Sequence, residues 1–153
     1  MSLSAFQNLA QKIGIKTTRL WIKKISYGNQ DISAGIDCFW LAAKARKTIL
    51  ISPMEQAQLM SRLISGNTAF SAKSIAVLKE MMRTKQTEQG TVYGKTGSGV
   101  NETGSYDLGW YVGFVENKQK TYAFACLVKG DNLMGKDAKE IVETVFFNKA
   151  DYK

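Results

Sequence analysis

Tyr93-Gly94-Lys95-Thr96-Gly97-Ser98-Gly99 is the stretch of this sequence that points most directly to a fold and to a site. Its central Lys-Thr-Gly triplet follows a short β-favouring run and precedes closely spaced glycines, so we expect it at the end of a strand, just before a turn. The lysine supplies a positive charge, the threonine supplies a hydroxyl group, and the glycine lets a ligand approach the backbone because it has no Cβ. Such a triplet also occurs by chance, and in isolation it usually marks a turn.

Four other motifs accompany the triplet along the chain: Tyr27-Gly28-Asn29, Asp37–Leu41, Ile51–Gln56 and Gly109–Gly113. In this order and spacing, the motifs resemble those of class D β-lactamases and of the related penicillin-sensor domains of membrane receptors. In those families Lys-Thr-Gly is one of three signature motifs. The resemblance runs from about Ser4 to the C-terminal helix, and it covers only the C-terminal part of the family's domain.

The family's nucleophile motif, Ser-x-x-Lys, has no counterpart at any serine or threonine of this sequence. In the family, that serine attacks the lactam carbonyl, and the lysine acts as its base, commonly as a carbamate. The second family motif, Ser-x-Val, is expected just before Phe6, where Met1-Ser2-Leu3 stands instead, a triplet consistent with an expression scar. The resemblance therefore implies that residues 4–153 are the C-terminal portion of the domain. We expect this portion alone to be inactive, because loss of the nucleophile lowers turnover by about a millionfold.

The resemblance also implies a binding site for the substrate carboxylate at Lys95 and Thr96, with Gly97 beside them. The backbone N–H of Ser98 is expected to be one of two donors to the oxyanion that forms during acyl transfer. Lys136 stands where the family often carries an arginine for the same carboxylate, and lysine keeps the charge but loses the bidentate geometry. No metal ion and no cofactor are expected in this site.

Tyr27, Gly28, Asn29 and Trp40 are expected to surround this site as a supporting layer. In the family, the tryptophan that matches Trp40 points its indole N–H toward the lysine of Ser-x-x-Lys. Because that lysine is absent from this sequence, packing is the expected role of Trp40. From the residues alone, Tyr27-Gly28-Asn29 is better explained as a plain turn.

The composition of the chain argues against several classes of protein. The formal net charge is +8, but the basic residues are scattered and not interleaved with aromatic residues, which favours a solvated basic surface over a nucleic-acid site. The sequence has no histidine, which removes histidine-based catalysis and argues against a zinc or iron site. Cys38 and Cys126 lie in apolar stretches, so we expect buried free thiols, with one disulfide between them as the alternative.

Hydrophobic periodicity predicts a helical part in the first half of the chain. Helices are expected from Ala5 to Ile13, from Arg19 to Ile25, from Pro53 to Ile64 and from Ser71 to Met82. Thr17 or Thr18 is the expected cap of the second helix, with Leu20, Trp21 and Ile25 facing inward. Ser52 and Glu55 predict a capping box at the start of the third, with a proline at its first position.

After Gly90 the pattern changes to that of strands, which we expect at residues 92–95, 108–116 and 121–129. Residues 84–90 are expected to form a polar loop, and residues 117–120 a tight hairpin. A final helix is expected to present one apolar face, formed by Ala138, Ile141, Val142, Val145 and Phe146. The predicted fold class is thus α+β, of β-lactamase/transpeptidase type and incomplete relative to the family: a helical part, an antiparallel three-strand meander and a C-terminal packing helix.

These observations predict a β-lactam (penicillin) recognition domain of a class D β-lactamase-like serine hydrolase. The alternative is a non-catalytic penicillin-sensor or interaction domain that keeps the fold. The expected ligand is a β-lactam or a peptidoglycan-like small molecule, with no nucleic acid as partner. The sequence shows no membrane span and no signal peptide, and the resemblance implies a periplasmic or extracellular location. Because the family's N-terminal strands and nucleophile helix are missing, we expect a homo-oligomer or a separate N-terminal segment to cover the exposed edge and apolar faces.

Overall fold

The computed structural model describes residues 3–41 and 48–147. Met1 and Ser2 of the expected scar, and residues 148–153 of the expected domain, lie outside the described residues. The elements follow one another as α1 (Leu3–Ile13), α2 (Ile15–Lys24), α3 (Pro53–Ile64), α4 (Ala72–Met82), β1 (Arg83–Thr87), β2 (Gly90–Val100), β3 (Tyr106–Glu116), β4 (Thr121–Lys129) and α5 (Gly135–Phe147). The predicted α+β class is confirmed.

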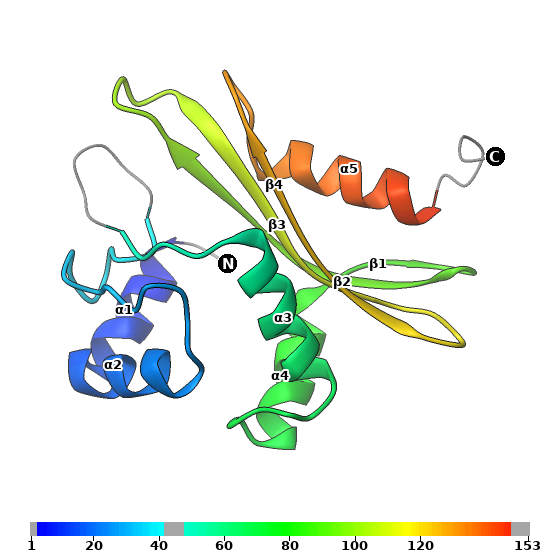
Figure 1. Ribbon diagram of the computed structural model, residues 1–153, viewed down its shortest axis with the longest axis horizontal. Coiled ribbons are helices and arrows are strands. Elements are labelled where there is room, and N and C mark those ends of the chain that lie inside the picture. The colour runs from blue at the N-terminus through cyan, green and yellow to red at the C-terminus, as the bar shows by residue number, and fades with distance from the viewer. Residues whose placement is uncertain (1–2, 42–47, 148–153) are drawn as a thin grey trace.

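The centre of the fold is an antiparallel sheet with the strand order β1-β2-β3-β4 (Figure 1). Helix α5 covers one face of the sheet, and the helices of the N-terminal half lie on the other side (Figure 1). Within the described residues, no helix combines the length and the apolar character needed to cross a membrane.

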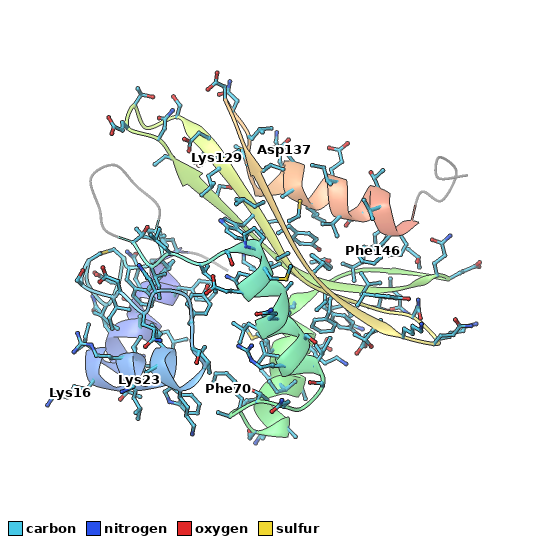
Figure 2. All side chains as sticks on the ribbon, in the orientation of Figure 1. Lys16, Lys23, Phe70, Lys129, Asp137 and Phe146 are labelled. Carbon is cyan, nitrogen blue, oxygen red and sulfur yellow. The ribbon has the colours of Figure 1, made fainter. Side chains whose placement is uncertain are left out.

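Two apolar cores hold these layers together, and side chains fill the space between helices and sheet (Figure 2). On the α5 face, Val92, Tyr111 and Val115 of the sheet pack with Ala138 and Val142 of the helix. On the other face, the second core contains four buried side chains of α3 and α4, namely Leu59, Met60, Leu63 and Met82. They pack against partly buried residues of the sheet. Because successive strand residues point to opposite faces, β2 contributes to both cores.

The sheet has four strands where we expected three, because residues assigned to a polar loop form strand β1. β1 pairs antiparallel with β2, from Arg83 opposite Tyr93 to Thr87 opposite Gly90. The prediction was wrong because β1 carries polar side chains on both faces and so lacks the alternating pattern of a half-buried strand. It is an edge strand, where polar residues are tolerated and protect against pairing with another chain.

Strand β2 also runs further than predicted. Lys95, Thr96 and Gly97 lie inside the strand and are not followed by a turn, because pairing with β3 continues to Val100 opposite Tyr106. The main-chain pairing keeps the glycine-rich segment extended. The turn comes later, where the Asn101 side chain accepts hydrogen bonds from the backbone N–H groups of Thr103 and Ser105, both at 3.0 Å.

The helix starts follow the predicted capping chemistry at α3 but not at α2. The Ser52 hydroxyl accepts from the backbone N–H of Glu55 at 3.2 Å, and the Glu55 carboxylate accepts from the backbone N–H of Ser52 at 2.8 Å, which confirms the capping box. Helix α2 instead begins directly after Gly14, whose φ is 80°, so Thr17 and Thr18 lie within the helix.

The predicted inner faces of α2 and α5 are partly wrong. Leu20 of α2 is 63% exposed and Ile22 is buried in its place. On α5, Ala138 and Val142 are buried, but Ile141 and Val145 are about half exposed. In both helices the buried stripe is therefore narrower than the apolar pattern, and the remaining apolar side chains point outward.

A matched pair of glycine variants tests the tight packing of β2 on β3. A Cβ at Gly113 would overlap the carbonyl oxygen of Tyr93, whereas a Cβ at Gly97 would meet only ordinary contact, 3.7 Å from the Trp110 Cβ. We expect Gly113→Ala to lower the free energy of unfolding by about 3 kcal/mol or more. Gly97→Ala should change it by less than about 1 kcal/mol. Urea unfolding of both variants checks this, and equal losses would contradict the packing described.

Candidate functional site

Lys95 lies on β2, on the sheet face that α3 and α4 cover. The neighbouring strand residue on that face, Tyr93, stacks on Phe114 at 4.6 Å and packs against the core of α3 and α4. The Lys95 side chain is exposed, and its Nζ donates a hydrogen bond to the Thr96 carbonyl oxygen at 2.6 Å. The ammonium group thus lies against the main chain of its own strand. Its partner in this hydrogen bond is a carbonyl oxygen and not a carboxylate.

Two hollows meet at residues 95–98 of β2. The sheet-side hollow, of about 500 Å³, is lined by residues that include Tyr27, Trp40, Gln56, Lys95 and Trp110. The helix-side hollow, of about 640 Å³, lies between these β2 residues and helix α1 and shares Trp40 with the first. Among the described residues that line either hollow, Lys95 is the only charged one. As far as the described residues go, the site therefore presents one cation between apolar and aromatic walls.

The backbone edge of β2 is open at this point. Strand β1 pairs with β2 only as far as Tyr93, so residues 94–100 have no strand on that side within the described chain. A Cβ built on Gly97 would meet no atom closer than 3.7 Å, so the space beside this residue is open. Unpaired strand edges offer N–H and C=O groups to a ligand, and the space at Gly97 admits one close to the backbone.

Helix α5 approaches the other face of the same residues. A Cβ on Gly135 would lie 2.6 Å from the Gly97 carbonyl oxygen and 2.9 Å from the Thr96 Cβ, so this close approach requires glycine. The Gly135 N–H donates to the Ser98 hydroxyl at 3.0 Å. Lys136 follows as the next residue; it is exposed and lines neither hollow.

Tyr27, the first residue of the Tyr27-Gly28-Asn29 loop, lines the sheet-side hollow. The Asn29 N–H donates to the Leu50 carbonyl at 2.9 Å, and the Leu50 N–H donates to the Asn29 side chain at 3.0 Å. Gly28 has a φ of 50°, and a Cβ there would overlap the Leu50 carbonyl. Gly28 and Asn29 thus fix the loop against segment 49–51, which lines the hollow together with Tyr27. More than a plain turn is present, because the loop and this segment build one wall.

Gln56, the last residue of the Ile51–Gln56 motif, belongs to this wall, although no role in the site was predicted for it. Its Nε2 donates a hydrogen bond to the Tyr27 hydroxyl at 2.7 Å, and it is itself buried. Burial raises the pKa of Tyr27, and the hydrogen bond from Gln56 acts in the opposite direction. The available signal was its position on the inner face of α3 with Met60 and Leu63, since a buried polar side chain requires a partner.

Trp40 links the two hollows. Its ring meets Phe39 edge to face at 4.9 Å, and it is partly buried. Cys38, close by, and Cys126, on β4, are both free and partly buried, so the described structure contains no bridge between them. The Cys38 thiol donates to the Ala34 carbonyl at 2.9 Å, and burial raises the pKa of Cys126. Among the described residues, no group of three or more His, Cys, Asp or Glu is placed to hold a metal ion.

Comparison with known proteins identifies the family. The family model described as the penicillin binding protein transpeptidase domain matches residues 2–147. The chain belongs to this family. The transpeptidase-domain match covers nearly all of the sequence, and it agrees with the motifs from which the resemblance was inferred.

Individual relatives narrow the comparison within the transpeptidase-domain family. The chain is 35% identical over 132 residues to "Probable beta-lactamase YbxI" of Bacillus subtilis (strain 168), a match that spans 86% of this chain and 47% of that protein. The solved structure of class D beta-lactamase BAT-2 matches with a TM-score of 0.84 at 32% identity, over 99% of this chain and 60% of that one. The C-terminal domain of the Bacillus licheniformis BlaR penicillin-receptor matches with a TM-score of 0.86 at 28% identity, over 99% and 59%.

The resemblance to class D β-lactamases and penicillin sensors is therefore confirmed, and so is the expected fold type. The chain spans about half the length of a curated relative such as YbxI, and the match covers the C-terminal portion of these relatives.

The buried Tyr27 hydroxyl leads to a prediction about alkaline pH. Its pKa is raised in the folded chain. The contribution of this hydroxyl group to the free energy of unfolding is therefore fully present below pH ~10, the ordinary tyrosine pKa, and is lost as the pH rises through the pKa of the folded state. We expect Tyr27→Phe to reduce the loss of unfolding free energy above pH ~10 by up to about 1.4 kcal/mol per pH unit. Urea unfolding between neutral pH and pH ~11 measures this slope. Identical slopes for the variant and the parent chain would contradict it.

Proposed function

We propose that this chain recognises β-lactams, or peptidoglycan-like peptides that end in a carboxylate, as the substrate-binding half of a serine acyl-transfer site. The carboxylate lies at Lys95 and Thr96, and the acyl group lies along the open edge of β2 in front of Gly97. The backbone N–H of Ser98 donates to the developing oxyanion. Lys136, beside the N-terminus of α5, adds positive charge on the far side of the strand.

The observation that carries this proposal is the isolated charge of Lys95. It is the one charged side chain among the described residues that line the two hollows, and the walls around it are mostly apolar or aromatic. An anion that enters such a site meets a cation in surroundings that screen it less than bulk water does. Its hydrogen bond to the neutral Thr96 carbonyl can be exchanged for one to a carboxylate, in which both partners are charged.

The remaining groups of the site act by position. Gln56 holds the Tyr27 ring through a hydrogen bond of 2.7 Å, and Tyr27 and Trp40 form the wall that faces Lys95. They exclude water and orient the ring system of the ligand. In a complete domain of this family, the serine nucleophile and its lysine base would come from polypeptide outside residues 1–153. Such a domain would hydrolyse β-lactams through a serine acyl-enzyme, in the periplasm or outside the cell.

A penicillin sensor is the second candidate function. It is supported by the match to the BlaR penicillin-receptor domain, which has a TM-score of 0.86 over 99% of this chain. The two functions share the recognition step and differ in the fate of the acyl-enzyme. In a complete domain, a labelled penicillin that is bound and then released as hydrolysed product indicates a β-lactamase, whereas a persistent covalent adduct indicates a sensor.

Binding of benzylpenicillin tests the role of Lys95. We expect Lys95→Gln to weaken binding by about tenfold or more, because a hydrogen bond to a charged group contributes roughly 1.5–3 kcal/mol. Lys129→Gln is the matched control, since Lys129 is an exposed lysine that lines neither hollow. Titration at low ionic strength, followed by NMR shifts of the tryptophan indoles, measures both affinities. Equal affinities for the two variants would refute the proposed carboxylate site.

Turnover provides a separate test. We expect the chain of residues 1–153 not to hydrolyse a chromogenic cephalosporin, because its sequence contains no Ser-x-x-Lys or Thr-x-x-Lys. The absorbance change should match that of buffer. Hydrolysis clearly faster than buffer, and abolished by Lys95→Ala, would show that the chain carries a nucleophile that the motifs do not reveal.

A further inference from the structure

A third hollow lies away from Lys95, where the end of α2 meets α3 and the loop that follows α3. Its volume is about 430 Å³. Two cationic side chains line it together with two hydroxyl groups and one amide, which belong to Lys24, Arg62, Ser26, Thr68 and Asn67. The described residues that line it include no aspartate and no glutamate. We call it the basic hollow, and none of these five residues lines the hollows beside Lys95.

The turn after α2 brings Arg62 to the wall of the basic hollow. Ser26 has a φ of 53°, a left-handed conformation that residues other than glycine seldom adopt, and its N–H donates to the Lys23 carbonyl at 3.1 Å. From α3, the Arg62 guanidinium reaches this turn and donates from Nη2 to the Ile25 carbonyl oxygen at 3.2 Å. Arg62 is half-buried. This hydrogen bond therefore holds a guanidinium group in place beside the hollow.

Neither cation of the basic hollow is paired with a carboxylate in the part of the chain that the structure describes. The ion pairs found there involve Lys79, Arg83, Lys85 and Lys139. Arg62 carries five N–H groups, and its described hydrogen bond uses one of them. The Lys24 Nζ lies 4.8 Å from the centre of the Trp21 ring, a cation–π contact that does not neutralise its charge. Two uncompensated like charges beside one hollow favour the entry of an anion.

The surroundings of the basic hollow add further positive charge. Residues 1–30 contain five basic residues, Lys12, Lys16, Arg19, Lys23 and Lys24, and no aspartate or glutamate. Lys16 and Lys23 are exposed on α2, on the side of the molecule away from α5 (Figure 2). A surface of one sign raises the local concentration of ions of the opposite sign. The end of α2 is therefore a place where anions gather, and the hollow offers them a shaped site.

We propose that the basic hollow binds a phosphate monoester group, carried by a soluble phosphate ester or by the head group of phosphatidic acid. The planar fork of Arg62 matches two phosphate oxygens, and Lys24 adds a point charge. Ser26, Thr68 and Asn67 carry hydroxyl and amide groups that can donate to the remaining oxygen. A phosphate monoester has three terminal oxygens for this donor set, whereas a carboxylate has only two. The volume of about 430 Å³ is within the range of small-molecule sites and leaves room for the group esterified to the phosphate.

The first probe is glycerol phosphate, titrated into the chain near neutral pH at an ionic strength of about 0.1 M. We expect saturable NMR shifts of the backbone amides of Ser26 and Thr68 and of the Trp21 indole N–H, because Trp21 contacts Lys24. Trp21→Phe identifies the indole signal. Acetate at the same ionic strength should bind at least about tenfold more weakly, because it engages fewer of the donors. The site does not involve Lys95, so this proposal and the proposed function fail or succeed separately.

Two pairs of variants locate the phosphate. Arg62→Gln and Lys24→Gln should each weaken glycerol phosphate by about tenfold or more, because each removes a charged donor. Arg19→Gln and Lys23→Gln are the matched controls, since both residues are exposed nearby and neither lines the basic hollow. The controls should change the affinity by less than about threefold, because exposed charges are screened at this ionic strength. Thermal melting shows whether Arg62→Gln, which also loses the hydrogen bond to Ile25, still folds, and Lys24→Gln removes no hydrogen bond found in the structure.

Vesicles distinguish the two sources of the phosphate group. Phosphatidylcholine vesicles that contain phosphatidic acid are compared, by co-sedimentation, with vesicles that contain phosphatidylglycerol at equal surface charge. A preference for phosphatidic acid that Lys24→Gln abolishes and Lys23→Gln keeps supports the lipid source. Binding of glycerol phosphate without such a preference supports the soluble ester.

Three results would overturn the proposal. The first is the absence of saturable shifts with glycerol phosphate together with no preference for phosphatidic acid. The second is equal weakening by the hollow variants and their controls, which would assign anion binding to the basic surface as a whole. The third is equal affinity for acetate and glycerol phosphate, which would show that the donor set does not recognise phosphate.

Discussion

The ring of Tyr111 occupies the space that Gly94 leaves by having no side chain, and the arrangement of the sheet depends on this contact. A Cβ at Gly94 would overlap the Tyr111 ring. That ring is fully buried, and its centroid lies 5.1 Å from the ring centroid of Phe124 on β4. The Tyr111 hydroxyl oxygen lies 3.0 Å from the hydroxyl oxygen of Thr84 on β1. A single side chain on β3 therefore contacts all three other strands. Burial raises the pKa of Tyr111, as expected for a hydroxyl enclosed in this way.

This contact sets the position of Lys95, the next residue along β2. With Gly94 held toward the α5 face, Lys95 must point to the opposite face, because side chains alternate along a strand. β1 ends its pairing at Tyr93, so the strand edge becomes free where the lysine begins. On the α5 face, Gly135 permits the helix to press against Thr96 and Gly97 and fixes the strand from behind. The open edge at Lys95 is therefore rigidly supported, which is what a recognition site requires.

How far the sequence predicts this structure depends on the range of the interactions. The capping box at Ser52 and the hairpin at residues 117–120 are local, and both are as predicted: the Asn117 N–H donates to the Lys120 carbonyl at 3.0 Å. Strand β1 and the glycine-rich end of β2 were missed, because their strand character comes from pairing with a neighbour and not from their own side chains. Similarly, the motifs identified Tyr27 and Trp40, but the partner Gln56 becomes visible only when α3 is placed beside the loop.

Phe39 and Trp40 stand beside the recognition site. Both side chains line the helix-side hollow, and Trp40 also lines the sheet-side hollow, which contains Lys95. Neither is fully buried in the described chain, although aromatic side chains of this size contribute most when they are enclosed. Since electrostatic attraction increases as water is removed, the aromatic wall that Trp40 contributes to the sheet-side hollow would favour the binding of an anion at Lys95.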